Sequence, residues 1–189
     1  MWKKCVTIAL TIVLSACMIS FNVSAVTVSF THIQQNKNKW SWAACDQMNA
    51  MLACPANYHD QSDIAGYVLG NYTDVYPSSI TNIASGVNYG CNNYKTFAGY
   101  SSPLSSSEIF SCLSVGYLVQ AELQYYNIYE EPTPHKKMVI VYEAYYDNST
   151  PYVRYYSPVT GSSDLTTLES FYNANAAAVY RYVRTVRKI

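Results

Sequence analysis

Two kinds of residue pattern divide this chain, and their order along the sequence constrains the fold more than any other feature. Before Gly116, apolar residues recur at the spacing of helical turns. From Tyr117 onward, β-branched and aromatic residues dominate, as is typical of strands. Helical signals followed by strand signals predict an α+β domain rather than alternating βαβ units.

The clearest helix is expected over Trp40–Leu52, because its apolar residues follow helical spacing and Pro55 comes just after its end. Ser105 and Glu108 form a capping box that starts another helix, which should stop at Gly116. Weaker helices are expected over 62–69, 78–84 and 165–172. Strands are expected over 117–125, 137–145, 152–156 and 177–186.

The first 25 residues have the pattern of a secretory signal peptide. A basic start at Lys3 and Lys4 precedes an apolar run and a small-residue site that ends at Ala25. We therefore expect a secreted chain with one domain over 26–189. Cys17 ends a segment, Leu-Ser-Ala-Cys, that is similar to a lipoprotein box, so a lipid anchor on this cysteine is the alternative.

Composition limits the partners of the predicted domain. The whole chain has a formal net charge of zero, so no global field favours nucleic acid or anionic membrane. We expect no stable membrane insertion once the signal peptide is removed. An even number of cysteines in an exported chain favours one or two disulfides, with the pairing open. The sequence has no CxxC pair, so a zinc site is not expected. The four cysteines after Ala25 are Cys45, Cys54, Cys91 and Cys112.

One short block carries the main functional signal. Gln35 is followed by four residues and then by Trp40, Ser41, Trp42 and two alanines. This block resembles the nucleophile segment of papain-like cysteine peptidases, in particular a bacterial secreted branch, with serine where the family has cysteine. The resemblance implies a papain-like fold with a helical half and an antiparallel β-sheet or barrel half. It also implies that Gln35 helps to stabilise the oxyanion and that no cofactor is needed.

Two later residues complete the site that the resemblance implies. His135 precedes an apolar strand and would be the general base toward Ser41. Ser157 stands where family members commonly carry Asp or Asn, which orients the histidine. A serine can accept that hydrogen bond but supplies no carboxylate. Because a hydroxyl does not ionise near neutrality, the changes at Ser41 and Ser157 both predict a weakened active site.

Three functions remain open from the sequence. The first is a secreted papain-like protein that has lost peptidase activity and keeps a cleft for a peptide or protein. The second is an active peptidase of the same fold, in which serine suffices or Ser41 replaces an original cysteine by mutagenesis. The third is an exported binding protein whose 20 tyrosines supply a binding face.

Overall fold

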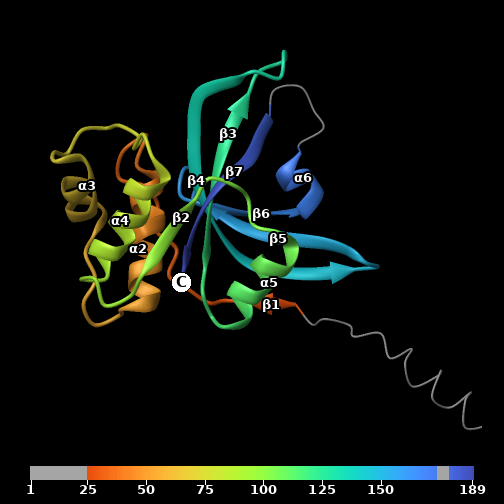
Figure 1. The fold of residues 1–189 in the computed structure, drawn as a ribbon, viewed down its shortest axis with the longest axis horizontal. Coiled ribbons are helices and arrows are strands. Elements are labelled where there is room, and N and C mark those ends of the chain that lie inside the picture. Colours follow the sequence, from red (N-terminus) through yellow and green to blue (C-terminus); the bar gives the residue numbers. More distant parts are fainter. Residues whose placement is uncertain (1–24, 174–178) are drawn as a thin grey trace, which may run out of the picture.

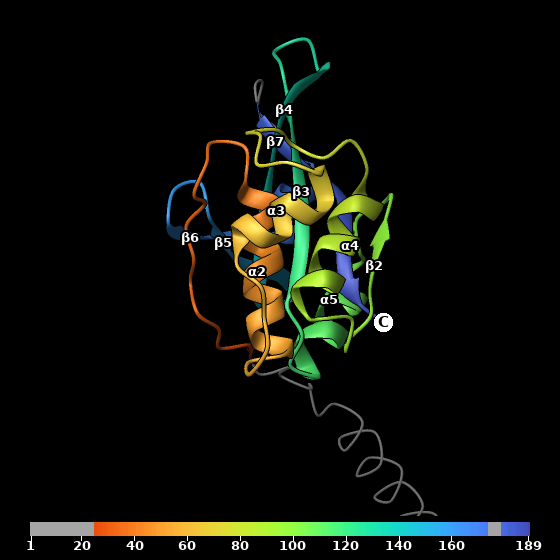
Figure 2. The same ribbon diagram turned by 90° about the vertical axis from the view of Figure 1, so that its left-hand side faces the viewer.

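A computed structural model describes residues 25–173 and 179–189 of the chain, and in it a helical group covers one face of a sheet. The signal peptide predicted over 1–25 and the cysteine of the lipoprotein alternative lie almost wholly outside the described residues. Figure 2 shows α2, α3 and α4 in front of the sheet. The helices are α2 (Ser41–Ala53), α3 (Gln61–Leu69), α4 (Ile80–Gly90), α5 (Ser106–Ser114) and α6 (Leu168–Tyr172).

The described strands form a single antiparallel sheet of seven strands, in the order β2-β7-β3-β4-β5-β6 with β1 paired to β4. The last strand, β7, therefore lies inside the sheet, between β2 and β3. The sheet is open, so the expected antiparallel sheet is confirmed but it does not close into a barrel. The strands are β1 (Val26–Thr27), β2 (Phe97–Tyr100), β3 (Val119–Tyr126), β4 (Pro132–Asp147), β5 (Thr150–Ser157), β6 (Ser162–Thr167) and β7 (Val179–Lys188).

The predicted α+β class is confirmed, with most helices before Gly116 and most strands after it, although β1 and β2 precede α5. The capping box is present at α5, where Ser105 Oγ accepts from the Glu108 N–H and Glu108 Oε2 accepts from the Ser105 N–H. The helix expected over 165–172 is shorter, because residues up to Thr167 pair with β5 as strand β6. Thr167 then caps α6 by accepting from the Ser170 N–H. Part of the strand expected over 177–186 lies outside the described residues.

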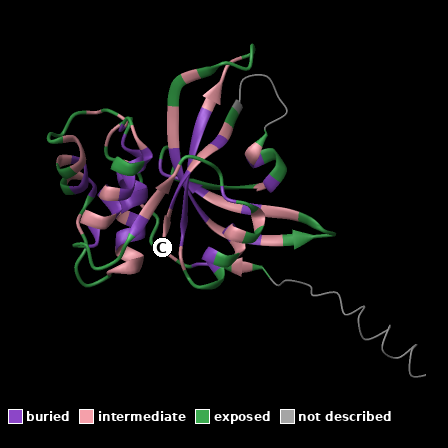
Figure 3. Ribbon diagram, viewed as in Figure 1, coloured by how far each residue is buried: buried purple, intermediate pink, exposed green. Residues whose placement is uncertain are grey.

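The core lies between the helical group and the sheet (Figure 3), and the two tryptophans of α2 and its N-cap are at its centre. Trp40 is 1% exposed and Trp42 is fully buried. From the sheet, Met138 and Ile140 on β4 are both fully buried. Successive residues of a strand face opposite sides, so these two side chains, two residues apart, share the face toward α2. The opposite face packs against α6, whose Phe171 ring lies 5.2 Å from that of Tyr155 on β5.

Asp46 is a carboxyl group inside this core. It lies on α2 and is fully buried, and Gln120 Nε2 of β3 donates to its Oδ1 at 3.0 Å. Its Oδ2 has no hydrogen-bond partner among the described residues. Burial raises the pKa of Asp46 well above its ordinary range, and the hydrogen bond from Gln120 opposes this only in part. Burial therefore favours the neutral form of this carboxyl.

The substitution Asp46→Asn should stabilise the protein at neutral pH. Above about pH 4 the unfolded chain releases the Asp46 proton that the folded state keeps, so the free energy of unfolding of the native chain falls as pH rises. An amide does not titrate, and we expect the variant to be more stable at pH 7 by about 1–3 kcal/mol. Urea unfolding at pH 4, 5.5 and 7 measures this, and the gain should shrink toward pH 4. Asp147→Asn, at an exposed turn, is the control; equal pH slopes for the native chain and Asp46→Asn would contradict the expectation.

Among the helices of the described ranges, 25–173 and 179–189, none combines the length and apolar character that crossing a bilayer requires.

Candidate functional site

The start of α2 is held rigidly by its two tryptophans. Trp40 Nε1 donates to the carbonyl of Thr73 at 2.9 Å, and Trp42 Nε1 donates to the carbonyl of Val75 at 3.3 Å. Both acceptors belong to the segment that links α3 to α4. Each buried indole is thus satisfied by a backbone carbonyl, as buried tryptophans require. Ser41, between the two rings, has a fixed position at the first turn of the helix.

The Ser41 hydroxyl is buried and already hydrogen-bonded. Ser41 is 2% exposed, and its Oγ accepts from the backbone N–H of Met138 on β4 at 3.0 Å. No side chain caps α2, so the free N–H groups of its first turn give this end a partial positive charge. Backbone N–H groups point within the plane of a sheet. Ser41 therefore approaches β4 from the side, with side chains of neighbouring strand residues on either face.

His135 lies on the same strand, three residues before Met138. Three residues of strand span roughly 10 Å, so His135 is displaced along β4 from the contact with Ser41. Its side chain is exposed, and its backbone N–H donates to Thr133 Oγ1 at 3.2 Å. The hydrogen bond of Ser41 Oγ goes to the Met138 N–H and not to this imidazole. The role of His135 as a base stays a prediction.

Lys137, rather than His135, directly precedes Met138, so its backbone adjoins the Ser41 contact, while its side chain lies on the opposite face of the sheet from that of Met138. Its ammonium lies 4.2 Å from the ring centre of Tyr180 on β7. Burial lowers the pKa of Lys137, and the nearby carboxylate of Asp164 opposes this. Position 137 was not among the predicted site residues, because it is a lysine and the motif calls for a histidine. The onset of the apolar run at Met138 marks where β4 enters the core and could have located it.

Gln35 contacts the chain just after Ser157, at the end of β5. The Gln35 N–H donates to the carbonyl of Pro158 at 3.1 Å. The Gln35 side-chain amide donates to the carbonyl of Asn38 at 2.8 Å, and its Oε1 is buried without a partner among the described residues. Ser157 is 1% exposed and its Oγ also has no partner there. The structure thus leaves two polar atoms that a ligand or a buried water could satisfy.

The sheet register relates Ser157 to Lys137. Ile140 on β4 is paired with Tyr156 on β5, so Ser157 comes opposite Val139. Lys137 is two residues from Val139 and shares its face, which makes residues 137 and 157 diagonal neighbours. Such diagonal positions are within reach of long side chains. Along the strands, position 137 is therefore next to the residue that contacts Ser41 and diagonal to Ser157, whereas 135 is two residues further away.

A pocket of about 350 Å³ opens beside the start of α2. Lysine and histidine side chains dominate its charged lining, and none of its lining residues is acidic. Of the carboxylates near its lining residues, Glu122 is paired with Arg184, Asp74 Oδ1 accepts from the Lys39 N–H at 2.7 Å, and Asp164 is near Lys137. The pocket is thus suited to a ligand that carries negative charge. Its lining residues are Asn38, Lys39, Tyr76, Pro134, His135, Lys136, Lys137, Val159 and Tyr180.

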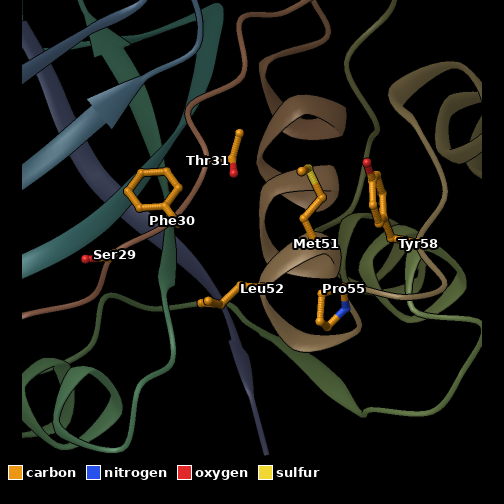
Figure 4. A pocket seen from close by; sticks show the side chains of 7 residues that line it. All are labelled: Ser29, Phe30, Thr31, Met51, Leu52, Pro55 and Tyr58. Carbon is orange, nitrogen blue, oxygen red and sulfur yellow. The ribbon is translucent and has the colours of Figure 1, made fainter.

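A second pocket, of about 510 Å³, lies at the other end of α2 (Figure 4). Phe30 and Thr31 of the N-terminal segment face Met51 and Leu52 of α2 across it, with Tyr58 at its rim. Met51 is ten residues after Ser41, which corresponds to about 15 Å along the helix. This pocket is mostly apolar and contains none of the predicted site residues.

The four cysteines that follow Ala25 are thiols in this structure. Burial is the largest cause that raises the pKa of Cys45 well above its ordinary value, so this thiol is a poor nucleophile. Within the described parts of the chain, no three His, Cys, Asp or Glu side chains are grouped to hold a metal ion.

No protein-family model matches the sequence, and a comparison with curated proteins finds no match.

Proposed function

We propose that this chain is a secreted protein of the papain-like fold that binds a peptide or protein segment without hydrolysing it efficiently. The observation that carries the proposal is the state of Ser41: its hydroxyl is buried at the start of α2 and accepts from the Met138 N–H. The open α+β architecture, with helices on one side and an antiparallel sheet on the other, agrees with that fold class. The function rests on this geometry together with the resemblance of the Gln35–Ala44 block.

Ser41 lacks the chemistry of an efficient nucleophile. A serine must lose its proton to a neighbouring base during attack, whereas a cysteine beside an imidazole can be a preformed thiolate. On β4, the residue that precedes the backbone contact with Ser41 is Lys137, an amine rather than an imidazole. Ser157, its diagonal neighbour, has no carboxylate with which to stabilise a protonated base. We therefore propose that this cleft binds a peptide rather than hydrolysing it efficiently.

The basic pocket indicates which peptides the cleft prefers. Lys39 and Lys137 line it together with His135, and the free N–H groups of α2 begin beside it. Acidic side chains of a bound peptide would face these cations. Each ion pair near a protein surface contributes about 0.2–1 kcal/mol, so discrimination should come from several contacts.

Peptides rich in glutamate should bind more tightly than the same peptides with glutamine, by roughly 2–5-fold for each charge that reaches the pocket. Fluorescence anisotropy of labelled peptide libraries, in low and high salt, measures this preference. Lys39→Gln and Lys137→Gln should each weaken it, while Lys95→Gln makes the same charge change at an exposed position outside the pocket and should not. The proposal fails if no peptide binds at any salt concentration.

The same peptides separate binding from hydrolysis. After incubation with the native chain, mass spectrometry should find them intact at times when a papain control has cleaved them. Rapid cleavage by the native chain, with covalent labelling of Ser41 by a fluorophosphonate, would instead establish a working serine nucleophile. That result would favour the active peptidase over the binding protein.

A further inference from the structure

The C-terminal ends of α2 and α4 meet at a single backbone carbonyl. Cys54 follows α2, and its N–H donates to the carbonyl of Ala50 at 2.8 Å. Cys91 follows α4, and its Sγ lies 4.0 Å from the same oxygen. The two helices are so close here that a Cβ atom added to Gly90 would lie 3.0 Å from the Cβ of Ala50. The two cysteines are thus neighbours in space although they are far apart in sequence.

The segments that follow the two cysteines are also joined to each other. The His59 N–H donates to the carbonyl of Gly90 at 3.0 Å, and Asn92 Nδ2 donates to the carbonyl of Asn57 at 2.9 Å. The His59 ring bonds Asn92 Oδ1 through Nε2 at 3.0 Å and stacks on Tyr89 with centroids 4.4 Å apart. These contacts hold both chain segments in place. Bringing the two sulfur atoms together therefore needs side-chain rotation and small shifts rather than a new backbone arrangement.

We propose that Cys54 and Cys91 form a disulfide that fastens the end of α2 to the end of α4 in an oxidising compartment. The two thiols are near enough for Cys54 to contribute to the raised pKa of Cys91, whose Sγ donates to the Ala50 carbonyl at 4.0 Å. The other cysteines have different surroundings. Cys45 is fully buried in the first turns of α2, nine residues and about 14 Å from Cys54 along the helix. Cys112 Sγ accepts from Nη1 of Arg187 on β7 at 3.9 Å.

The accessibility of the two thiols sets the order of the reaction. Cys54 is partly exposed, whereas Cys91 is buried. Burial, together with Cys54, raises the pKa of Cys91 to about 12, so Cys91 is the slower nucleophile. The Cys54 thiolate attacks one sulfur of an external disulfide such as oxidised glutathione, and releases one glutathione thiolate. Cys91 then gives its proton to solvent and attacks the Cys54 sulfur, which releases the second glutathione. Two protein thiols are oxidised and one glutathione disulfide is reduced.

The direct test is peptide mapping of the purified wild-type domain, 26–189, after oxidation with glutathione disulfide and blocking of free thiols. We expect the loss of two hydrogen atoms in the intact mass and a crosslinked peptide pair that contains Cys54 and Cys91. Cys45 and Cys112 should be alkylated once the protein is unfolded. A crosslink to either of these two cysteines, or four alkylated thiols after prolonged oxidation, would overturn the proposal.

A stability measurement gives a second and independent readout. The bond would close a loop of more than thirty residues, so its reduction should lower the melting temperature by roughly 5–15 °C. Cys54→Ser should have a melting temperature that no longer depends on reductant, whereas Cys112→Ser should keep the full dependence. The wild-type mapping remains decisive if Cys54→Ser does not fold. An identical reductant effect in Cys54→Ser and in the native chain would also overturn the proposal.

Discussion

A chain that carries Ser41→Cys, Lys137→His and Ser157→Asp together should hydrolyse peptides at least about 10²-fold faster than one that carries Ser41→Cys alone. The reason is geometric. The Met138 N–H contacts Ser41, so position 137 adjoins the residue that contacts the nucleophile, and positions 137 and 157 are diagonal neighbours on one face of the sheet. A cysteine, an imidazole and a carboxylate at these positions would form the acid–base relay that the native chain lacks.

The control for this experiment is His135→Ala. In the triple variant it should leave kcat/KM nearly unchanged, because residue 135 is two residues further along β4 and is exposed. If Ser41→Cys alone is as fast as the triple variant, and His135→Ala abolishes its activity, then His135 is the base that the sequence predicted. The assignment of position 137 would then be wrong.

Glu122→Gln should lower the free energy of unfolding by about 3–5 kcal/mol, the usual effect of removing one partner from a buried ion pair. Glu122 is fully buried on β3, where Arg184 of β7 donates to both of its carboxylate oxygens at 2.8 and 2.6 Å. Tyr76 donates to Oε2 at 3.2 Å, and the Lys136 ammonium lies 3.7 Å from Oε1. The substitution would leave the guanidinium with no carboxylate in a setting with little water.

Glu143→Gln is the matched control, since Glu143 also binds an arginine, Arg154, at 3.0 Å on neighbouring strands. That pair is partly exposed, so its loss should change stability by about 1 kcal/mol or less. Urea denaturation of both variants at pH 7 gives the comparison. Equal effects would mean that solvent reaches Glu122 far more than its position indicates.

The parts of the fold that could be predicted are those with local causes. The capping box at Ser105 and the spacing of apolar residues in α2 act within a few residues of the chain. The short strands β1 and β2 could not be predicted, because β2 exists only through pairing with β7, almost ninety residues later. The sequence of β6 is polar and largely exposed, so it shows no apolar alternation. Its strand conformation comes from its partner β5.

The candidate site also has a part that could be predicted from local sequence and a part that could not. The block from Gln35 to Trp42 is a local motif, and the structure places Ser41 at the start of a helix as the motif predicts. The position of a base depends on which residue of β4 lies against Ser41, and this is a matter of strand register. His135 and Lys137 are only two residues apart in sequence. A shift of two residues along a strand moves a side chain by roughly 7 Å, which separates contact from no contact.

The interior position of β7 has a consequence for how this protein is made. Its neighbours, β2 and β3, come from the middle of the chain and cannot be joined through the sheet until residues up to Lys188 are present. A ribosome that has not yet released this segment holds a chain with two unpaired strand edges, which favours association with other chains. Loss of only the last strand should therefore abolish folding rather than trim an edge.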